Sequence, residues 1–223
     1  MSTPTRIGVI GGTGNEGRGL ALRFAAAGAR VIIGSREASR AVAVAADLAA
    51  SVHGPITIMG ADNQTAIAQS DVVILTVPFA HAVATIRAHA ADFVPDTLLL
   101  DVVVPLSFEG GQPRMIDIEE GSMAEALRAH LPEHVQLACA FKTLPARLLE
   151  HHTEPLECDD FICGDSPATR ERAAGVIAQI PGLRPVDCGP LDAARALERM
   201  TWLCVRLNKR YQKHGARFQV LGI

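Results

Sequence analysis

Short apolar runs alternate with longer amphipathic segments through the first 140 residues of the chain. The runs are rich in valine, isoleucine and leucine, which is typical of strands that are buried on both faces of a sheet. Strands are expected at residues 7–10, 29–33, 56–59, 71–77, 98–104 and 135–141. Helical segments are expected between them at 18–27, 38–52, 62–69, 79–91 and 122–130. This alternation predicts an α/β fold with a doubly wound (Rossmann) parallel sheet.

The pattern changes after Pro105. Residues 105–121 have no clear period and are expected to form a long loop at the carboxyl end of a strand, where open α/β sheets bind ligands. Beyond residue 144, shorter strands are expected at 161–163 and 184–187, with helices at 167–179 and 191–211. We therefore predict a nucleotide-binding domain over residues 1–144 and a small C-terminal α/β domain over residues 145–223.

Three glycines follow the first predicted strand at the spacing G-x-G-x-x-G, namely Gly12, Gly14 and Gly17. In a dinucleotide-binding turn the first glycine permits the tight turn, the second lets a pyrophosphate approach the backbone, and the third allows close packing of the helix. The free amides and dipole of the following helix favour an anion. The alternative is a glycine turn that only packs a helix on a sheet.

The end of the second predicted strand indicates which dinucleotide is bound. An NAD site usually carries an acidic residue here to hold the ribose 2′-hydroxyl. This chain has no acid at residues 34–36 and offers Ser35, Arg36 and Arg40 instead. A hydroxyl and two planar cations suit a 2′-phosphate, so we predict NADP(H). The alternative is that the two arginines form a solvated helix face.

Three further segments, 76–79, 103–105 and 141–145, end strands at the same predicted edge of the sheet. They are apolar and carry no compact acid–base group, which favours hydride transfer between stacked rings with water excluded. Two residues there have open interpretations. His81 either bonds a ligand or caps its own helix, and Lys142 either binds a ligand anion or reaches solvent.

Composition narrows the function classes. The 223 residues are 48% hydrophobic and carry a formal net charge of −3, which argues against nucleic-acid binding. No apolar run reaches the length of a membrane span. Five cysteines occur without a C-x-x-C motif, which predicts reduced thiols in a cytoplasmic protein.

Two charged clusters have simple interpretations. Glu150, His151 and His152 with Cys158 match no zinc spacing, so no metal site is expected and a solvated helix end is the better interpretation. The basic run Arg206, Lys209, Arg210 and Lys213 is typical of a solvated face, although it is also suited to a phosphate or carboxylate tail.

Four segments carry a resemblance to a known family: 11–15 (GGTGN), 32–36 (IIGSR), 76–82 (TVPFAHA) and 182–191 (GLRPVDCGPL). They resemble the NADPH-dependent reductases of coenzyme F420, a deazaflavin. The resemblance extends over residues 7–211 and implies a C-terminal domain that covers the deazaflavin, and a homodimer. The chain departs from the family where Lys142 replaces a histidine and Phe79 replaces a tryptophan. The resemblance implies NADP contacts from Thr13, Gly14, Asn15, Glu16, Ser35, Arg36, Arg40, Val77 and Ala146.

The leading prediction is an oxidoreductase that transfers hydride between NADPH and coenzyme F420. One alternative is an NADPH-dependent reductase of a flavin or of a small carbonyl or imine substrate, and another is a non-catalytic NADP sensor. The full predicted cofactor set is Gly12, Thr13, Gly14, Asn15, Glu16, Gly17, Ser35, Arg36, Arg40, Thr76, Val77, Pro78 and Ala146. The predicted acceptor set is Phe79, His81, Val104, Pro105, Lys142 and Leu144, with Lys142 as the one catalytic candidate. The acceptor's identity, the physiological direction of transfer and the oligomeric state stay open.

Overall fold

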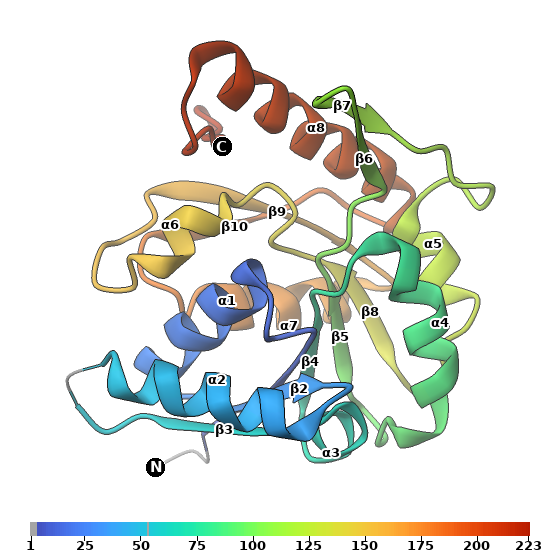
Figure 1. Ribbon diagram of the computed structural model, residues 1–223. Helices are drawn as coiled ribbons and strands as arrows, with labels where there is room; N and C mark the ends of the chain where they lie inside the picture. Colours follow the sequence, from blue (N-terminus) through green and yellow to red (C-terminus); the bar gives the residue numbers. More distant parts are fainter. Residues whose placement is uncertain (1–3, 53) are drawn as a thin grey trace.

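The computed structural model describes residues 4–52 and 54–223 and contains a central eight-stranded sheet with helices on both faces (Figure 1). The strands of this sheet are β1 (Arg6–Ile10), β2 (Arg30–Ser35), β3 (Thr57–Asp62), β4 (Val72–Leu75), β5 (Leu98–Asp101), β8 (Gln136–Cys139), β9 (Cys158–Gly164) and β10 (Leu183–Asp187). The helices are α1 (Asn15–Ala26), α2 (Ala38–Ala50), α3 (Asn63–Ala68), α4 (Phe79–His89), α5 (Met123–Arg128), α6 (Ala146–Glu150), α7 (Pro167–Ile177) and α8 (Ala194–Tyr211), with 3₁₀ turns η1 (Ala90–Asp92) and η2 (Leu191–Ala193).

The strand order is β10-β9-β8-β5-β4-β1-β2-β3. The six strands from β8 to β3 run parallel, which confirms the predicted doubly wound sheet. β9 pairs antiparallel with β8 and parallel with β10, so the last two strands run opposite to the others. Strands from residues 145–223 thus extend the same sheet, and the domain division at residue 144 stays a prediction.

The core has two layers because side chains alternate along each strand. Ile7 and Val9 of β1 pack into a cluster with α1, α2 and α7, whereas Ile10 faces a second cluster with α3, α4 and α5. A third, smaller cluster packs Leu197 of α8 against Phe161 of β9. α8 therefore lies apart from the two main layers, alongside the short antiparallel hairpin at the top of Figure 1.

Three helix starts were predicted from local sequence and are confirmed. Asp62, Ser122 and Ser166 each accept a hydrogen bond from the backbone amide three residues later, at 2.7, 3.2 and 3.1 Å. Each side chain thereby satisfies an amide that has no partner within its helix. The Ser122 hydroxyl also donates to the Glu125 carboxylate, so both residues of the sequence pattern S-x-x-E take part in this cap.

Several expected boundaries are wrong. α1 begins at Asn15 and not at residue 18, so Gly17 lies inside its first turn. The loop expected over residues 105–121 contains an antiparallel hairpin, β6 (Leu106–Glu109) and β7 (Gln112–Met115), turned by two glycines with positive φ. The five-residue helix α6 was not expected. These elements are too short to show a periodic sequence pattern, and tertiary contacts stabilise them.

Candidate dinucleotide and acceptor site

The glycine turn connects β1 to α1 as expected, but the left-handed residue is Gly11, with φ of 78°, and not Gly12. A β-carbon on Gly12 would lie 2.7 Å from Val9 O, so this position is closed by packing. A β-carbon on Gly17 would lie 2.6 Å from Gly12 Cα, which confirms the close packing predicted for the third glycine. The turn therefore contains four glycines, of which the motif names three.

Gly14 differs from its neighbours because a β-carbon there would meet only Gly11 O, at 3.5 Å. The residue is exposed and directly precedes α1, whose first helical hydrogen bond runs from Arg18 N to Gly14 O. The amides of residues 15–17 are thus donors without a partner in the helix. An open glycine before a free helix start fits a pyrophosphate, because the backbone can be approached closely and the helix dipole favours an anion.

The predicted 2′-phosphate residues lie beside this turn. Gly34 of β2 is in register with Ile10 of β1, so Ser35 and Arg36 follow at the same edge of the sheet. The Ser35 hydroxyl accepts a hydrogen bond from Glu37 N at 3.2 Å, which shapes the bend into α2. Arg36 and Arg40 are exposed, and within the described residues neither guanidinium has an ion-pair partner. Both cations are available to an anion.

The end of β4 packs directly on the glycine turn. Thr76 Oγ1 donates to Ile10 O at 2.9 Å, and a β-carbon on Gly11 would meet a Val77 methyl at 2.9 Å. Pro78 then precedes α4, which carries Phe79 half-buried and His81 exposed. α4 has no side-chain cap, so the alternative in which His81 caps its own helix is wrong.

The ends of β4, β5 and β8 are level, because Leu75 is in register with Asp101 and Asp101 with Cys139. The segments that follow these strands therefore meet at one edge, as the sequence predicted. Val104 is half-buried and Pro105 buried on one segment, and Leu144 is buried on the next. Ala146 starts α6 and is half-buried. The structure brings these predicted residues to the same side of the sheet as the glycine turn.

Lys142 is the exception among the predicted residues. Its side chain is 1% exposed and its Nζ lies 2.7 Å from Asp101 Oδ2 and 3.6 Å from Glu198 Oε1. Burial by itself lowers the pKa of Lys142, but the charges of Asp101, Cys139 and Glu198 and the hydrogen bond to Asp101 together outweigh it and raise this pKa above the ordinary value. The expectation that Lys142 reaches solvent is wrong, and its ammonium is already neutralised by protein carboxylates.

Two more carboxyl groups lie near Lys142. Glu16, in the first turn of α1, is half-buried, and burial raises its pKa to about 8, with Lys142 acting in the opposite direction. Asp160 of β9 is fully buried, and burial raises its pKa to about 7 although its two oxygens accept from Phe141 N at 2.8 and 2.9 Å. Near neutral pH, a fraction of the Glu16 and Asp160 carboxyl groups beneath the site is therefore protonated and uncharged.

Sequence reasoning missed Asp101 and Glu198. Asp101 ends a run of three leucines, and an acid that closes a buried strand at the ligand edge is a usable signal. Glu198 has no such signal, because it approaches Lys142 from α8, 56 residues further along the chain. No cluster of three or more possible metal-ligating side chains occurs among residues 4–52 and 54–223.

The parallel sheet, the open Gly14 before α1 and the arginines after β2 define a dinucleotide-binding protein of the Rossmann class. A family model described as NADP oxidoreductase coenzyme F420-dependent matches residues 6–105. The F420-dependent NADP reductase of Methanothermobacter thermautotrophicus is 40% identical over 222 residues, covering 98% of this chain and 95% of the relative. That of Methanocaldococcus jannaschii is 31% identical over 223 residues, covering 98% and 99%. The chain belongs to the F420-dependent NADP reductase family.

Solved structures agree on the fold. A crystal structure from Arthrobacter sp. FB24 superposes with a TM-score of 0.81 at 22% identity, covering 98% of this chain and all of that one. A glycerol-3-phosphate dehydrogenase from Coxiella burnetii superposes with a TM-score of 0.60 at 15% identity, over 82% of this chain and 54% of that one. In the part of the chain that the structure describes, no helix is both long and apolar enough to cross a membrane.

Proposed function

We propose that this protein transfers hydride between NADPH and the deazaflavin of coenzyme F420, in either direction. The observation that carries the proposal is the open Gly14 at the start of α1, placed at the same sheet edge as Arg36 and as the apolar segments after β4, β5 and β8. Membership of a family whose curated relatives are named F420-dependent NADP reductases supports the acceptor.

The glycine turn and α1 bind the pyrophosphate through backbone amides, with Thr13, Asn15 and Glu16 at its rim. Ser35, Arg36 and Arg40 hold the 2′-phosphate, since two guanidinium groups provide several directed donors. Thr76 and Val77 sit against the turn and Ala146 starts the neighbouring helix, so these residues border the nicotinamide half of the cofactor.

The acceptor is placed by apolar surface. Phe79, Val104, Pro105 and Leu144 are buried or half-buried on segments that meet beside the nicotinamide, and His81 is exposed at the rim. Such a surface favours ring stacking and excludes water, which protects a hydride in transit. In the direction of F420 reduction, the electron pair of the C4–H bond of NADPH forms the new C5–H bond of the deazaflavin. A proton from solvent then neutralises the reduced ring.

A spectroscopic experiment tests this function. NADPH and protein are mixed with oxidised F420, with flavin mononucleotide or with neither, and absorbance is followed over time. We expect F420 to be bleached together with NADPH consumption. Turnover of the flavin alone would favour the general flavin reductase, and binding of NADPH without any turnover would favour the sensor.

We further propose a homodimer formed through the outer face of α8 and the β6–β7 hairpin. Phe108, Leu203 and Tyr211 on these elements are 62%, 41% and 68% exposed, and Met115 and Trp202 line the groove between them. Exposed apolar surface of this kind favours a protein contact. Sedimentation analysis of wild type and of Leu203→Glu tests the dimer; a monomeric wild type would contradict it.

The five free thiols support a cytoplasmic location.

A further inference from the structure

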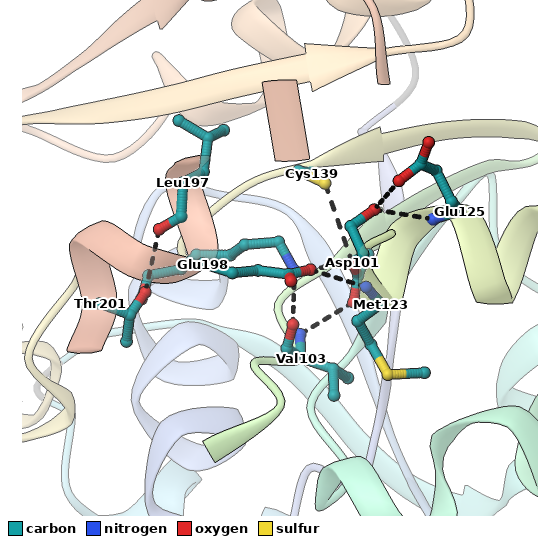
Figure 2. Close-up of polar contacts among 10 residues, drawn as sticks. Asp101, Val103, Met123, Glu125, Cys139, Leu197, Glu198 and Thr201 are labelled. Carbon is teal, nitrogen blue, oxygen red and sulfur yellow. Dashed lines mark hydrogen bonds and ion pairs between the residues drawn. The ribbon is translucent and has the colours of Figure 1, made fainter. Parts of the chain in front are cut away.

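Three charged side chains are buried together beneath the acceptor side of the crevice: Asp101 of β5, Lys142 after β8 and Glu198 of α8. Their side chains are at most 2% exposed. Figure 2 shows Glu198 extending from α8 toward Asp101 and Met123, with Val103 directly below. Lys142 Nζ joins the two acids, at 2.7 Å from Asp101 and 3.6 Å from Glu198. This cluster, called the Asp–Lys–Glu cluster below, links three elements that are distant in sequence.

The Asp–Lys–Glu cluster holds the backbone on either side of the hairpin. Asp101 Oδ1 accepts from Val103 N at 2.8 Å, and Lys142 Nζ donates to Val103 O. Glu198 Oε1 accepts from Met123 N at 3.0 Å (Figure 2). Residues 102–123 leave the sheet and return to α5, so both ends of this excursion are fixed by the same cluster. Val104 and Pro105, which form the proposed acceptor wall, follow Val103 directly.

α8 also fixes the middle of this excursion and the segment after β8. Trp202 Nε1 donates to Pro113 O at 3.1 Å, and Lys209 Nζ donates to Gly111 O. Thr201 Oγ1 donates to Lys142 O at 2.7 Å. One helix therefore contacts the hairpin and the end of residues 102–123 directly, and it reaches their start through Lys142, whose ammonium lies near Glu198 and bonds Val103 O. The acceptor wall has α8 as its support.

Stability alone does not explain the buried charges, because apolar side chains of similar volume often stabilise a core as well or better. An ion cluster with three backbone contacts instead restricts the geometry, since a shifted loop would leave charges unpaired. Burial raises the pKa of Glu198 to about 7, and the positive charge of Lys142 opposes this shift. The contact with Lys142 therefore favours the ionised form of the Glu198 carboxyl group.

We propose that Glu198 is a positioning residue that acts through Lys142 and Met123 to hold Val104 and Pro105 in place for the acceptor. The inference depends on the proposed hydride transfer to F420 only in its expected effect on the kinetics. Glu198 touches no ligand site directly, and Lys142 contributes to acceptor binding through the backbone of Val103 and not as an anion contact.

The kinetic test compares Glu198→Gln with wild type. Glutamine keeps an oxygen for Met123 N but has no charge for Lys142. We expect kcat/KM for F420 to fall about 10-fold or more, while the NADPH dissociation constant stays within about 2-fold. Glu171→Gln, the same change at an exposed position of α7, is the matched control and should leave both unchanged. A folded Glu198→Gln with wild-type kcat/KM would overturn the proposal.

Amide hydrogen exchange provides a second readout that does not depend on the acceptor. In Glu198→Gln we expect faster exchange at residues 102–105 and 121–124, with unchanged protection in β1. If Glu198→Gln does not fold, Thr201→Val removes the hydroxyl bond to Lys142 O together with the longer bond to Leu197 O within α8, and should loosen residues 141–144 and 102–105. Unchanged exchange in the folded variant overturns the inference. Absence of F420 turnover by wild type would contradict the proposed function alone, because the exchange measurement still decides the role of Glu198.

Discussion

Gly17 packs directly on Gly12, since a β-carbon on Gly17 would lie 2.6 Å from Gly12 Cα and 2.7 Å from Thr76 Oγ1. Gly14, two residues after Gly12, has open space at the same position. The glycines of one motif therefore do different things: two are required by the packing of the protein itself, and one leaves room for a ligand.

Gly14→Val should abolish nucleotide binding and leave the protein folded, because its side chain would occupy the place of the pyrophosphate without meeting protein atoms. Gly17→Ala should instead lower the stability, because its methyl group meets backbone. Calorimetric NADPH titration and thermal unfolding of both variants test this. Binding by Gly14→Val within about tenfold of wild type would mean that the turn is only a packing device.

Arg36→Ala should weaken NADPH binding by about 1.5–3 kcal/mol, the range for a charge-assisted hydrogen bond. NADH binding should hardly change, because NADH lacks the 2′-phosphate. Arg30→Ala is the control, since Arg30 is an exposed arginine at the opposite end of the same strand. Titration of both nucleotides provides the measurement. Tighter binding of NADH than of NADPH to the wild type would rule out the cofactor assignment.

Asp160→Asn should stabilise the protein above pH 7. The pKa of Asp160 is raised by burial to about 7 in the folded state, so folding favours the protonated form. Its contribution to stability therefore decreases as the pH rises from about 4 to about 7 and stays low above that. An asparagine oxygen still accepts from Phe141 N. We expect a gain on the order of 1–4 kcal/mol at pH 7.5 that vanishes toward pH 4.

Asp71→Asn serves as the opposite case for this pH series. The hydrogen bond from Arg6 lowers the pKa of Asp71, so its stabilising effect is present at neutral pH and is lost as the pH falls below 4. Asp71→Asn should therefore destabilise the protein at pH 7.5 and have no effect at low pH. Denaturant unfolding at several pH values measures both variants. A pH-independent difference for Asp160→Asn would show that folding does not change the pKa of Asp160 and would contradict the assigned effect of burial.

Arg23→Ala should destabilise the fold by about 3 kcal/mol, because it leaves several buried carbonyl groups without a donor. Arg23 is 2% exposed, and its guanidinium donates to four backbone oxygens at 2.6–3.1 Å, those of Leu148, Leu149, His151 and Glu154. Arg6→Ala, which breaks an exposed ion pair, should cost at most about 1 kcal/mol. Urea unfolding compares the two variants; equal losses would contradict the assigned role of Arg23.

Much of the fold was predictable because its signals are local. The apolar runs mark six parallel strands, and the serine or aspartate caps at Asp62, Ser122 and Ser166 mark three helix starts. The glycine turn and the arginines after β2 are also readable, since strand, turn and helix follow one another within about 30 residues. In these cases each residue acts on its near neighbours in the chain.

The hairpin at residues 106–115 and the short helix α6 were not predictable in this way. Each has too few residues to be stable alone, and each is held by long-range bonds, such as Trp202 to Pro113 and Arg23 to carbonyls within and just after α6. The position of β9 and β10 in the sheet has the same origin, because strand pairing across 20 or more residues leaves no periodic trace in the sequence.

The sequence by itself determined the strand–turn–helix of the predicted nucleotide site, the absence of an acid after the second strand and the family. Only the tertiary structure decided the environment of Lys142. The sequence placed this lysine correctly at the end of a strand, but its ammonium is enclosed by Asp101 and Glu198, which lie 41 and 56 residues away in the chain. Whether a charged side chain faces solvent, a ligand or a buried partner depends on which distant groups the fold brings near it, because burial and ion pairing are properties of the packed chain.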